Sequence, residues 1–281
     1  MQIKKIGILF HPMLEATRLK AQELAAFLES QHIRVWACSA WEADKASESL
    51  ADTDLILTAG GDGTILRAAQ VVLKKDIPIL GINMGTLGFM TEIQAAEAVS
   101  KLPEILNGKG WLDERSLLEA QLLPASEKTA SPGIIFALND VVLARGAIAK
   151  LIQVNASVGD KPLTIYRADG VIAATATGST GYSLAAGGPV LYPQSEDYLL
   201  VPIVSHLTPG HSLVLPAKAE VKLQLITNSQ ATLSIDGHIN IPLNSGAVVR
   251  IRRSLHKIKF LRLREQQYFF NVLEEKLRGK R

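Results

Sequence analysis

The spacing of apolar and polar residues divides the chain into two halves with different secondary-structure patterns. Up to about residue 112, continuous apolar runs alternate with amphipathic stretches. Such runs predict strands buried on both faces, and the stretches between them suit helices. The expected strands are 3–10, 33–37, 54–59 and 77–82, and the expected helices are 15–29, 65–73 and 95–106. This order predicts a parallel sheet with helices on its faces, which is a Rossmann-like α/β architecture.

After Trp111, short strand patterns follow one another with few helices between them. They lie at 117–123, 133–143, 152–158, 163–166, 198–204, 221–226, 231–235 and 248–251. Repeated strands at turn-sized spacings predict a β-rich, sandwich-like domain. The last pattern, 268–277, places Phe269, Leu273 and Leu277 on one face of a helix. We therefore expect an α/β domain over 1–112, a β-rich domain over 113–263, and a C-terminal helix within 264–281.

Composition and charge narrow the classes of partner. The chain has 281 residues, of which 47% are apolar and 20% charged, values typical of a soluble globular protein. The net charge is only +3, and the basic residues of 249–253 and 257–263 alternate with apolar ones, as on the wet face of a strand. No stretch approaches the roughly 20 apolar residues of a membrane span. The single cysteine, Cys38, suits a reducing cytoplasm. We expect a cytoplasmic protein that binds neither nucleic acid nor a membrane.

The first chemical signal is the sequence Gly-Gly-Asp-Gly-Thr at residues 60–64. It follows the third expected strand and precedes a helix, at a sheet edge where ligands bind. We expect phosphate to bind at Gly60, Gly61, Gly63 and Thr64, because glycines allow a close approach and a helix N-terminus attracts anions. Asp62 would repel phosphate unless it binds a metal, takes a proton or contacts a hydroxyl, so it indicates phosphoryl transfer. The alternative is a tight turn in which Asp62 caps the helix.

A second glycine-rich turn, 83–89, follows the next expected strand. It should lie beside the first turn if the two strands are neighbours. Asn83 either contacts a ligand or satisfies backbone groups of the turn. Phe89 either stacks on a ring of the ligand or belongs to the core. The residues alone leave both alternatives open.

Two segments of the second half also carry polar chemistry. Asn139 and Asp140 interrupt an apolar run, and buried polar groups need partners. A ligand rich in hydroxyls and amines would supply them, whereas the alternative is a bulge or turn between two short strands. The segment 167–189 is dominated by small residues, which let the backbone approach a ligand, and Tyr182 adds an amphipathic ring. It lacks the GxSxG spacing of a nucleophile elbow.

Together, the turns at 60–64 and 83–89, Leu-Asn-Asp at 138–140 and the segment 169–189 resemble the NAD kinase family. Their order and spacing match over nearly the whole chain. Gly-Gly-Asp-Gly-Thr alone also occurs in diacylglycerol and sphingosine kinases, and a similar run occurs in phosphofructokinases. The glycine- and serine-rich segment 169–189 is the specific part of the match.

The resemblance implies an enzyme that phosphorylates the adenosine-ribose 2′-hydroxyl of NAD with ATP or another donor. A divalent metal such as Mg²⁺ would arrive with the donor. It also implies homo-oligomers, dimers or tetramers, with NAD held between domains and partly by a neighbouring subunit, and a C-terminal helix that returns to the first domain. By position, Asp62 matches the proposed catalytic base. The residues implied to contact NAD are Asp62, Gly63, Asn139, Asp140, Lys150, Arg167, Asp169, Thr180, Gly181, Tyr182, Ser183, Leu184, Ala185 and His238.

The sequence departs from the family pattern at three places. The common TPTGSTAY reads TATGSTGY at 175–182, and Asp140 is the shorter acid of the allowed pair. None of these changes removes a functional group. His206 and His211 flank a turn, and without a companion ligand at metal spacing we expect no structural zinc. The rival hypotheses are a lipid kinase that shares the turn at 60–64 and a non-catalytic dinucleotide sensor.

Overall fold

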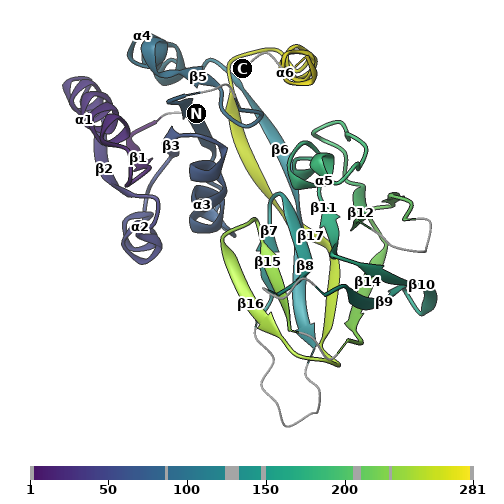
Figure 1. The fold of residues 1–281 in the computed structure, drawn as a ribbon. Helices are drawn as coiled ribbons and strands as arrows, with labels where there is room; N and C mark the ends of the chain where they lie inside the picture. The colour runs from purple at the N-terminus through teal and green to yellow at the C-terminus, as the bar shows by residue number, and fades with distance from the viewer. Residues whose placement is uncertain are drawn as a thin grey trace. The chain divides into compact units, whose positions relative to one another are not determined.

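The computed structural model describes residues 3–85, 88–123, 133–146, 150–204, 210–227 and 230–278 (Figure 1). The chain forms two compact units. Unit 1 comprises 1–114 and 258–281, and unit 2 comprises 115–257. Two long strands, β6 (Trp111–Leu123) and β17 (Val248–Arg262), extend across these boundaries along the chain. The C-terminal segment therefore belongs to the same unit as the N-terminal one.

Unit 1 is built on a parallel sheet in the order β2-β1-β3-β4. The other edge of β4 pairs in parallel with β5 at Ile82 and with the end of β17 at Ile79. The strands are β1 (Lys5–Phe10), β2 (Arg34–Ser39), β3 (Leu55–Gly60), β4 (Ile79–Asn83) and β5 (Ile93–Gln94). The helices are α1 (Glu15–Ser30), α2 (Ala43–Ser49), α3 (Asp62–Val72), α4 (Ala98–Leu106), α6 (Tyr268–Leu277) and the single turn η1 (Ala95–Glu97).

Helices cover both faces of this sheet because its strands alternate between two apolar sides. Ile6 and Ile8 of β1 belong to one core cluster with Leu24 of α1 and Leu102 of α4. The intervening positions face α3: a Cβ at Gly81 would lie 2.6 Å from the Ile65 side chain. The predicted parallel α/β sheet is confirmed.

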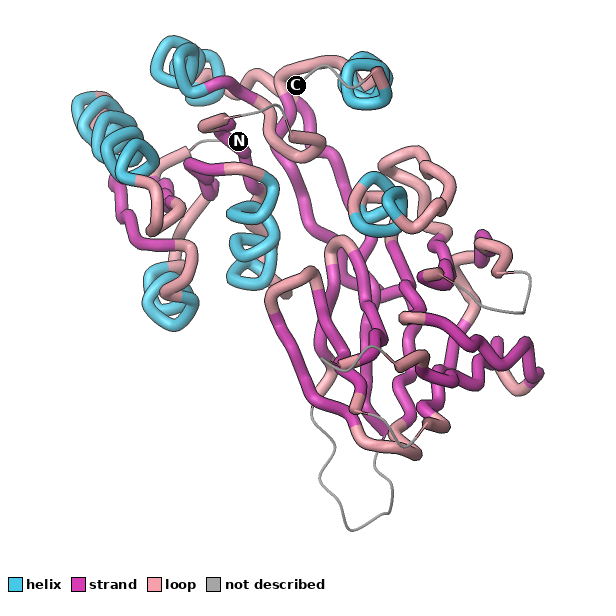
Figure 2. Tube along the Cα trace, viewed as in Figure 1, coloured by secondary structure: helices cyan, strands magenta, loops and turns pink. Residues whose placement is uncertain are grey.

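Unit 2 consists mainly of strands (Figure 2). One sheet has the order β13-β12-β11-β8-β15-β16, and the other contains β10-β9-β14 followed by β17, with β6 and β7. Apolar side chains from both sheets form one core cluster, which includes Val141, Leu143, Val221 and Ile251. The strands are β7 (Ile135–Ala137), β8 (Asp140–Arg145), β9 (Ile152–Val158), β10 (Lys161–Ala168), β11 (Gly170–Ala174), β12 (Tyr198–Ile203), β13 (Leu213–Leu215), β14 (Glu220–Leu225), β15 (Ala231–Ile235) and β16 (Ile239–Leu243). Two short helices, η2 (Gly178–Thr180) and α5 (Tyr182–Ala185), lie after β11. The β-rich, sandwich-like prediction is confirmed.

Several elements differ from the prediction for identifiable reasons. The expected strand 133–143 is two strands, because a bend at 138–139 separates β7 from β8. Helix α2 was not expected, since only Ala46 of its seven residues is buried and no apolar stripe marks it. Strand β11 was not among the expected strands, and it lies inside the small-residue segment 167–189. The expected turn residue His206 lies outside the described residues.

Candidate functional site

The first glycine turn joins β3 to α3 in unit 1. Gly60 ends the strand, Gly61 precedes the helix, and Asp62 is the first helical residue. A Cβ at Gly60 would lie 2.1 Å from Oγ1 of the buried Thr64, so the close packing of this turn requires glycine. Gly61 and Gly63 are exposed. The N–H groups of Thr64 and Ile65 donate to Gly61 O at 3.0 and 3.4 Å. The start of α3 at Asp62 and Gly63 therefore lies beside exposed glycine backbone, an arrangement suited to binding a phosphate.

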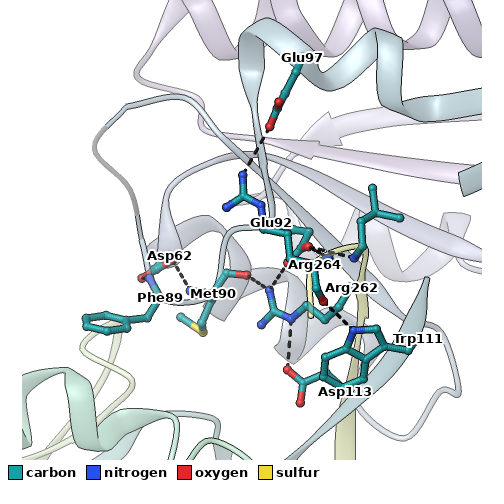
Figure 3. A network of polar contacts seen from close by, with 10 residues as sticks. Asp62, Phe89, Met90, Glu92, Glu97, Trp111, Asp113, Arg262 and Arg264 are labelled. Atoms are coloured by element: carbon teal, nitrogen blue, oxygen red, sulfur yellow. Dashed lines mark hydrogen bonds and ion pairs between the residues drawn. The ribbon is translucent and has the colours of Figure 1, made fainter. Parts of the chain in front are cut away.

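The Asp62 side chain reaches away from its own helix toward the second glycine turn (Figure 3). Its Oδ2 accepts a hydrogen bond from the Phe89 backbone N–H at 2.9 Å, and its Oδ1 accepts one from Met90 at 3.1 Å. A Cβ at Gly88 would lie 2.2 Å from Oδ1, so glycine also makes this approach possible. The alternative of Asp62 as an N-cap is wrong. Gly61 occupies the N-cap position of α3, and Asp62 is the first residue inside the helix.

The second turn lies beside the first, as expected for neighbouring strands. Gly60 of β3 is paired with Asn83 of β4. The buried Asn83 side chain donates to Gly85 O at 2.8 Å and to Gln94 Oε1 at 3.1 Å. Both N–H donors of the Asn83 amide are therefore used within the protein. This favours the alternative in which Asn83 holds the turn over the one in which it contacts a ligand. The Phe89 ring lies 6.3 Å from that of Phe269 in α6, so it has an aromatic partner within unit 1.

In unit 2, the bend before β8 is held by a carboxylate that the sequence analysis missed. Asp236 accepts hydrogen bonds from the backbone N–H groups of Leu138 at 2.9 Å, Asn139 at 2.7 Å and Asp140 at 3.1 Å. These three bonds hold the backbone that carries the Asn139 and Asp140 side chains. Asp236 is only 6% exposed, so the bend is anchored from inside the domain.

The local sequence around Asp236 carried a signal that could have identified it. Asp236 and Gly237 have positive φ angles of 50° and 69°, and His238 N–H donates to Ile235 O at 3.1 Å. These are the features of the tight hairpin turn that Asp-Gly favours between alternating strands. Strands β15 and β16 flank this turn. His238 lies beside Asp236, with Nδ1 3.1 Å from the Asp236 backbone oxygen.

A cavity of about 400 Å³ opens above this bend, a size within the range of small-molecule pockets. Among the described residues, Oδ1 of Asn139 is buried and has no hydrogen-bond partner. An unsatisfied buried acceptor is costly, so it indicates a ligand that donates a hydrogen bond here. The cavity is lined by Asn139, Asp140, Val142, Ala144, Tyr182, Ser234, Asp236 and Gly237.

Both carboxyl groups of this cavity have raised pKa values. Burial and the negative charge of Asp236 raise the pKa of Asp140 to about 7. Burial also raises the pKa of Asp236, and the three backbone N–H donors oppose that shift. The pKa of about 7 makes Asp140 the acid of this cavity that titrates near neutral pH. The cavity can therefore gain or lose a charge near neutral pH.

The small-residue segment packs directly on the Asn139 bend. Thr175 Oγ1 donates to Leu138 O at 2.6 Å, and a Cβ at Gly178 would lie 2.0 Å from Asn139 O. Tyr182 lines the cavity and is 48% exposed. Oγ of the fully buried Ser183 has no partner among the described residues. The remaining expected residues of this segment lie in η2, the following turn and α5; they are Thr180, Gly181, Leu184 and Ala185.

Three expected NAD contacts lie elsewhere in unit 2. Strand β11 runs antiparallel to β8, so Asp169 and Arg167 lie at the Arg145 end of β8, about 17 Å from Asp140 at roughly 3.4 Å per residue. Asp169 accepts a 2.7 Å hydrogen bond from Arg145 Nε. Lys150 and Arg167 are exposed. Within one chain, these side chains are not part of the cavity at Asn139.

The described part of the chain contains no group of three or more His, Cys, Asp or Glu residues that could hold a metal ion. His211 is exposed. In the same residues, no helix combines the length and apolar character required to cross a bilayer.

Comparison with known proteins places these features in a family. The family model described as the ATP-NAD kinase N-terminal domain matches residues 6–110, and that of the ATP-NAD kinase C-terminal domain matches 138–263. An NAD kinase of Dehalococcoides mccartyi is 51% identical, and the alignment covers 98% of this chain and 96% of that protein. An NAD kinase of Chloroflexus aurantiacus is 41% identical over 98% of this chain and 99% of its own.

Solved structures agree with these sequence matches. A yeast NADH kinase complexed with NADH superposes with a TM-score of 0.86 at 25% identity, covering 100% of this chain and 89% of that one. An NAD kinase from Archaeoglobus fulgidus in complex with ATP gives a TM-score of 0.77 at 25% identity, covering 96% and 98%.

Proposed function

The chain belongs to the NAD kinase family, and on that premise we propose that it transfers a phosphoryl group from ATP to the adenosine-ribose 2′-hydroxyl of NAD, forming NADP. The observation that carries the proposal is the unpartnered Asn139 Oδ1 beside Asp140 in a cavity of about 400 Å³. An adenosine moiety supplies the amine and hydroxyl donors that these two acceptors require. Asn139 and Asp140 bind adenosine, Tyr182 provides a ring surface, and the other residues of 180–185 and His238 border the same ligand.

In this proposal, the chemistry belongs to the glycine turn of unit 1. The ribose hydroxyl oxygen attacks the γ-phosphorus, the bond from that phosphorus to the bridging oxygen of ADP breaks, and the hydroxyl proton passes to Asp62. We place the phosphates at residues 60–64, where Gly61 and Gly63 expose their backbone, whereas Gly60 and Thr64 are buried and the Thr64 N–H already donates to Gly61 O at 3.0 Å. Such transfers depend mainly on positioning and charge stabilisation, and a base adds about 10²–10⁴-fold.

The Asp62 carboxylate also sets a requirement for the donor. Its negative charge would repel the phosphates of free ATP. A divalent cation bound to those phosphates offsets the repulsion, and Mg²⁺ typically binds through phosphates and few protein ligands. The described residues contain no cluster that could form a resident metal site. We propose, from the repulsion between Asp62 and the phosphates, that the metal arrives with the donor as Mg-ATP.

The positions of Lys150, Arg167 and Asp169 support a homo-oligomer. These residues lie at the end of β8 opposite to Asp140, yet the family resemblance assigns them to NAD. A second copy of the chain, contributing them to the first copy's cavity, reconciles both observations. Exposed apolar side chains on the same hairpin region, Leu151, Leu163 and Ile165, support a subunit interface there. The free, buried Cys38 supports a reducing cytoplasm as the location.

Incubation of the purified protein with Mg-ATP and NAD tests the proposed reaction. We expect NADP to form, with no phosphorylation of diacylglycerol or sphingosine in parallel reactions. Lipid phosphorylation without NADP would favour the lipid-kinase hypothesis. Tight NAD binding without any product would favour a dinucleotide sensor.

A further inference from the structure

The buried side chain of Arg262 lies at the centre of an ionic network in unit 1 (Figure 3). Its Nε donates to Asp113 Oδ2 at 3.1 Å, and its Nη1 is 3.2 Å from Glu92 Oε2. These three side chains are only 7%, 2% and 4% exposed, respectively. Removing one member of such a group is costly, since it leaves buried charges uncompensated. Stability alone would therefore explain the ion pairs.

The third contact of Arg262 is to the backbone near Asp62. Nη1 also donates to the backbone oxygen of Met90 at 2.8 Å. The N–H of the same Met90 donates to Asp62 Oδ1 at 3.1 Å, next to the bond from Phe89 N–H. A single residue thus connects the guanidinium of Arg262 to the carboxylate assigned to proton transfer.

The backbone at Met90 depends on such anchors because it belongs to no strand. Residues 88–92 form an irregular segment between β4 and β5. Asp62 binds this segment from one side and Arg262 binds it from the other. Glu92, whose Oε1 accepts the Leu263 and Arg264 backbone N–H groups at 2.9 and 2.8 Å, fixes the end of β17 to the same segment. The position of the Met90 amide is thus coupled to the guanidinium.

We propose that Arg262 is a positioning residue for phosphoryl transfer, which acts on Asp62 through the Met90 backbone and touches no substrate. The inference rests on the proposed role of Asp62. A carboxylate that must accept a proton during an in-line transfer has to be aimed, and small misplacements cost about 10²-fold in rate. Arg262 holds the Met90 backbone, and the N–H groups of Phe89 and Met90 orient the Asp62 carboxylate.

Variants at 262 test this inference by separating chemistry from binding. Arg262→Met should lower the single-turnover rate by about 10- to 100-fold, while the dissociation constants of NAD and Mg-ATP change less than about 2-fold. Arg262→Lys should recover part of the rate, because it keeps a cation near Met90 O. The matched control is Arg264→Met. The Arg264 side chain pairs with Glu97 at 3.5 Å and lies 4.3 Å over the Tyr268 ring, so its loss should lower the melting temperature while leaving the rate nearly unchanged.

A double-mutant cycle with Asp62→Asn distinguishes positioning from stability. If Arg262 acts through Asp62, Arg262→Met should change the rate less than about 2-fold in the Asp62→Asn background. Equal fractional losses in both backgrounds, or a rate in Arg262→Met as high as in Arg264→Met, would overturn the proposal. If Arg262→Met does not fold, Arg262→Lys and Arg262→Gln carry the same cycle. A fully active Asp62→Asn would remove the proposed base and this inference together, whereas a slow Asp62→Asn with additive losses would remove only the role of Arg262.

Discussion

Asp140 and Asp236 are joined by two reciprocal hydrogen bonds. Oδ1 of Asp236 accepts the Asp140 backbone N–H at 3.1 Å, and the Asp236 backbone N–H donates to Asp140 O at 3.0 Å. Asp236 thus holds the backbone bend that carries the Asp140 side chain. Asp140 lines the cavity of unit 2, and in the proposed function its carboxyl group binds the ribose hydroxyls there.

Replacement of Asp140 should weaken NAD binding selectively. In the proposed complex, the contacts of Asp140 to the adenosine form before the chemical step, so their loss should raise the Michaelis constant more than it slows the bound reaction. A hydrogen bond to a charged group contributes about 1.5–3 kcal/mol. Asp140→Ala should therefore raise KM for NAD by about 10- to 150-fold and leave KM for Mg-ATP nearly unchanged, as measured by steady-state kinetics.

The opposite pattern would reassign the pockets. Loss of ATP affinity with retained NAD affinity would place the donor in the cavity at Asn139. Equal loss of both, together with a lower melting temperature, would make Asp140 a structural residue of the bend.

The pKa of Asp140 predicts a pH dependence of NAD use. A carboxylate accepts hydrogen bonds more strongly than a neutral carboxyl group, and the pKa of Asp140 is raised to about 7. The kcat/KM for NAD should therefore rise as the pH increases through about 7. Asp140→Asn should remove this limb of the profile. Persistence of the same limb in Asp140→Asn would assign the titration to another group.

The same pKa shift affects stability in the opposite direction. The native state keeps a proton on Asp140 that the unfolded state, with an ordinary pKa of 3.8, has released. The contribution of Asp140 to the free energy of unfolding is therefore fully present below pH 4 and is lost as the pH rises to about 7. Thermal melts of the wild type and Asp140→Asn between pH 4 and 8 should converge toward low pH if this proton is the one concerned. A difference between them that does not vary with pH would contradict the assignment.

Asp236→Asn should affect both the bend and the titration. The NH₂ group of the new amide faces the Leu138 N–H, from which the carboxylate accepts a hydrogen bond in the wild type. Two donors then face each other, and one unmade buried hydrogen bond costs about 1–3 kcal/mol. We expect a lower melting temperature and weaker NAD binding. Because the charge of Asp236 helps to raise the pKa of Asp140, the acid limb of kcat/KM should move to lower pH. An unmoved limb would show that the two acids do not interact.

The fold of unit 1 and the family could be predicted from sequence because their signals are local. Apolar runs marked β1, β3 and β4, and the glycines that follow β3 and β4 marked the two turns. The contacts of Asp62 could not be predicted, since Phe89 and Met90 lie about 27 residues farther along the chain. The role of Asp236 was also hidden, because it depends on how β15 pairs with β8. Its Asp-Gly turn was visible in the sequence, but not the three amides that it binds.

A subunit-mixing experiment tests whether two copies share each site. If one copy supplies Asp140 and its neighbour supplies Arg167, Asp140→Ala and Arg167→Ala should each be nearly inactive alone at NAD concentrations well below the KM of either variant. Random exchange into dimers leaves about a quarter of the sites with both native residues, so the mixture should recover about that fraction of activity. No recovery after demonstrated exchange would place Arg167 outside the shared site. High activity of Arg167→Ala alone would exclude it from NAD binding.

The most direct test of the central claim is the single-turnover rate of Asp62→Asn with saturating NAD and Mg-ATP. The asparagine cannot accept the proton, and it also turns a donor toward one of the two amides at Phe89 and Met90. Folding should be confirmed by thermal melting and by the affinity for NAD. We expect a rate about 10²–10⁴-fold below the wild type with NAD affinity little changed. A folded variant that retains more than about a tenth of the wild-type rate would contradict the assignment of Asp62 as the base.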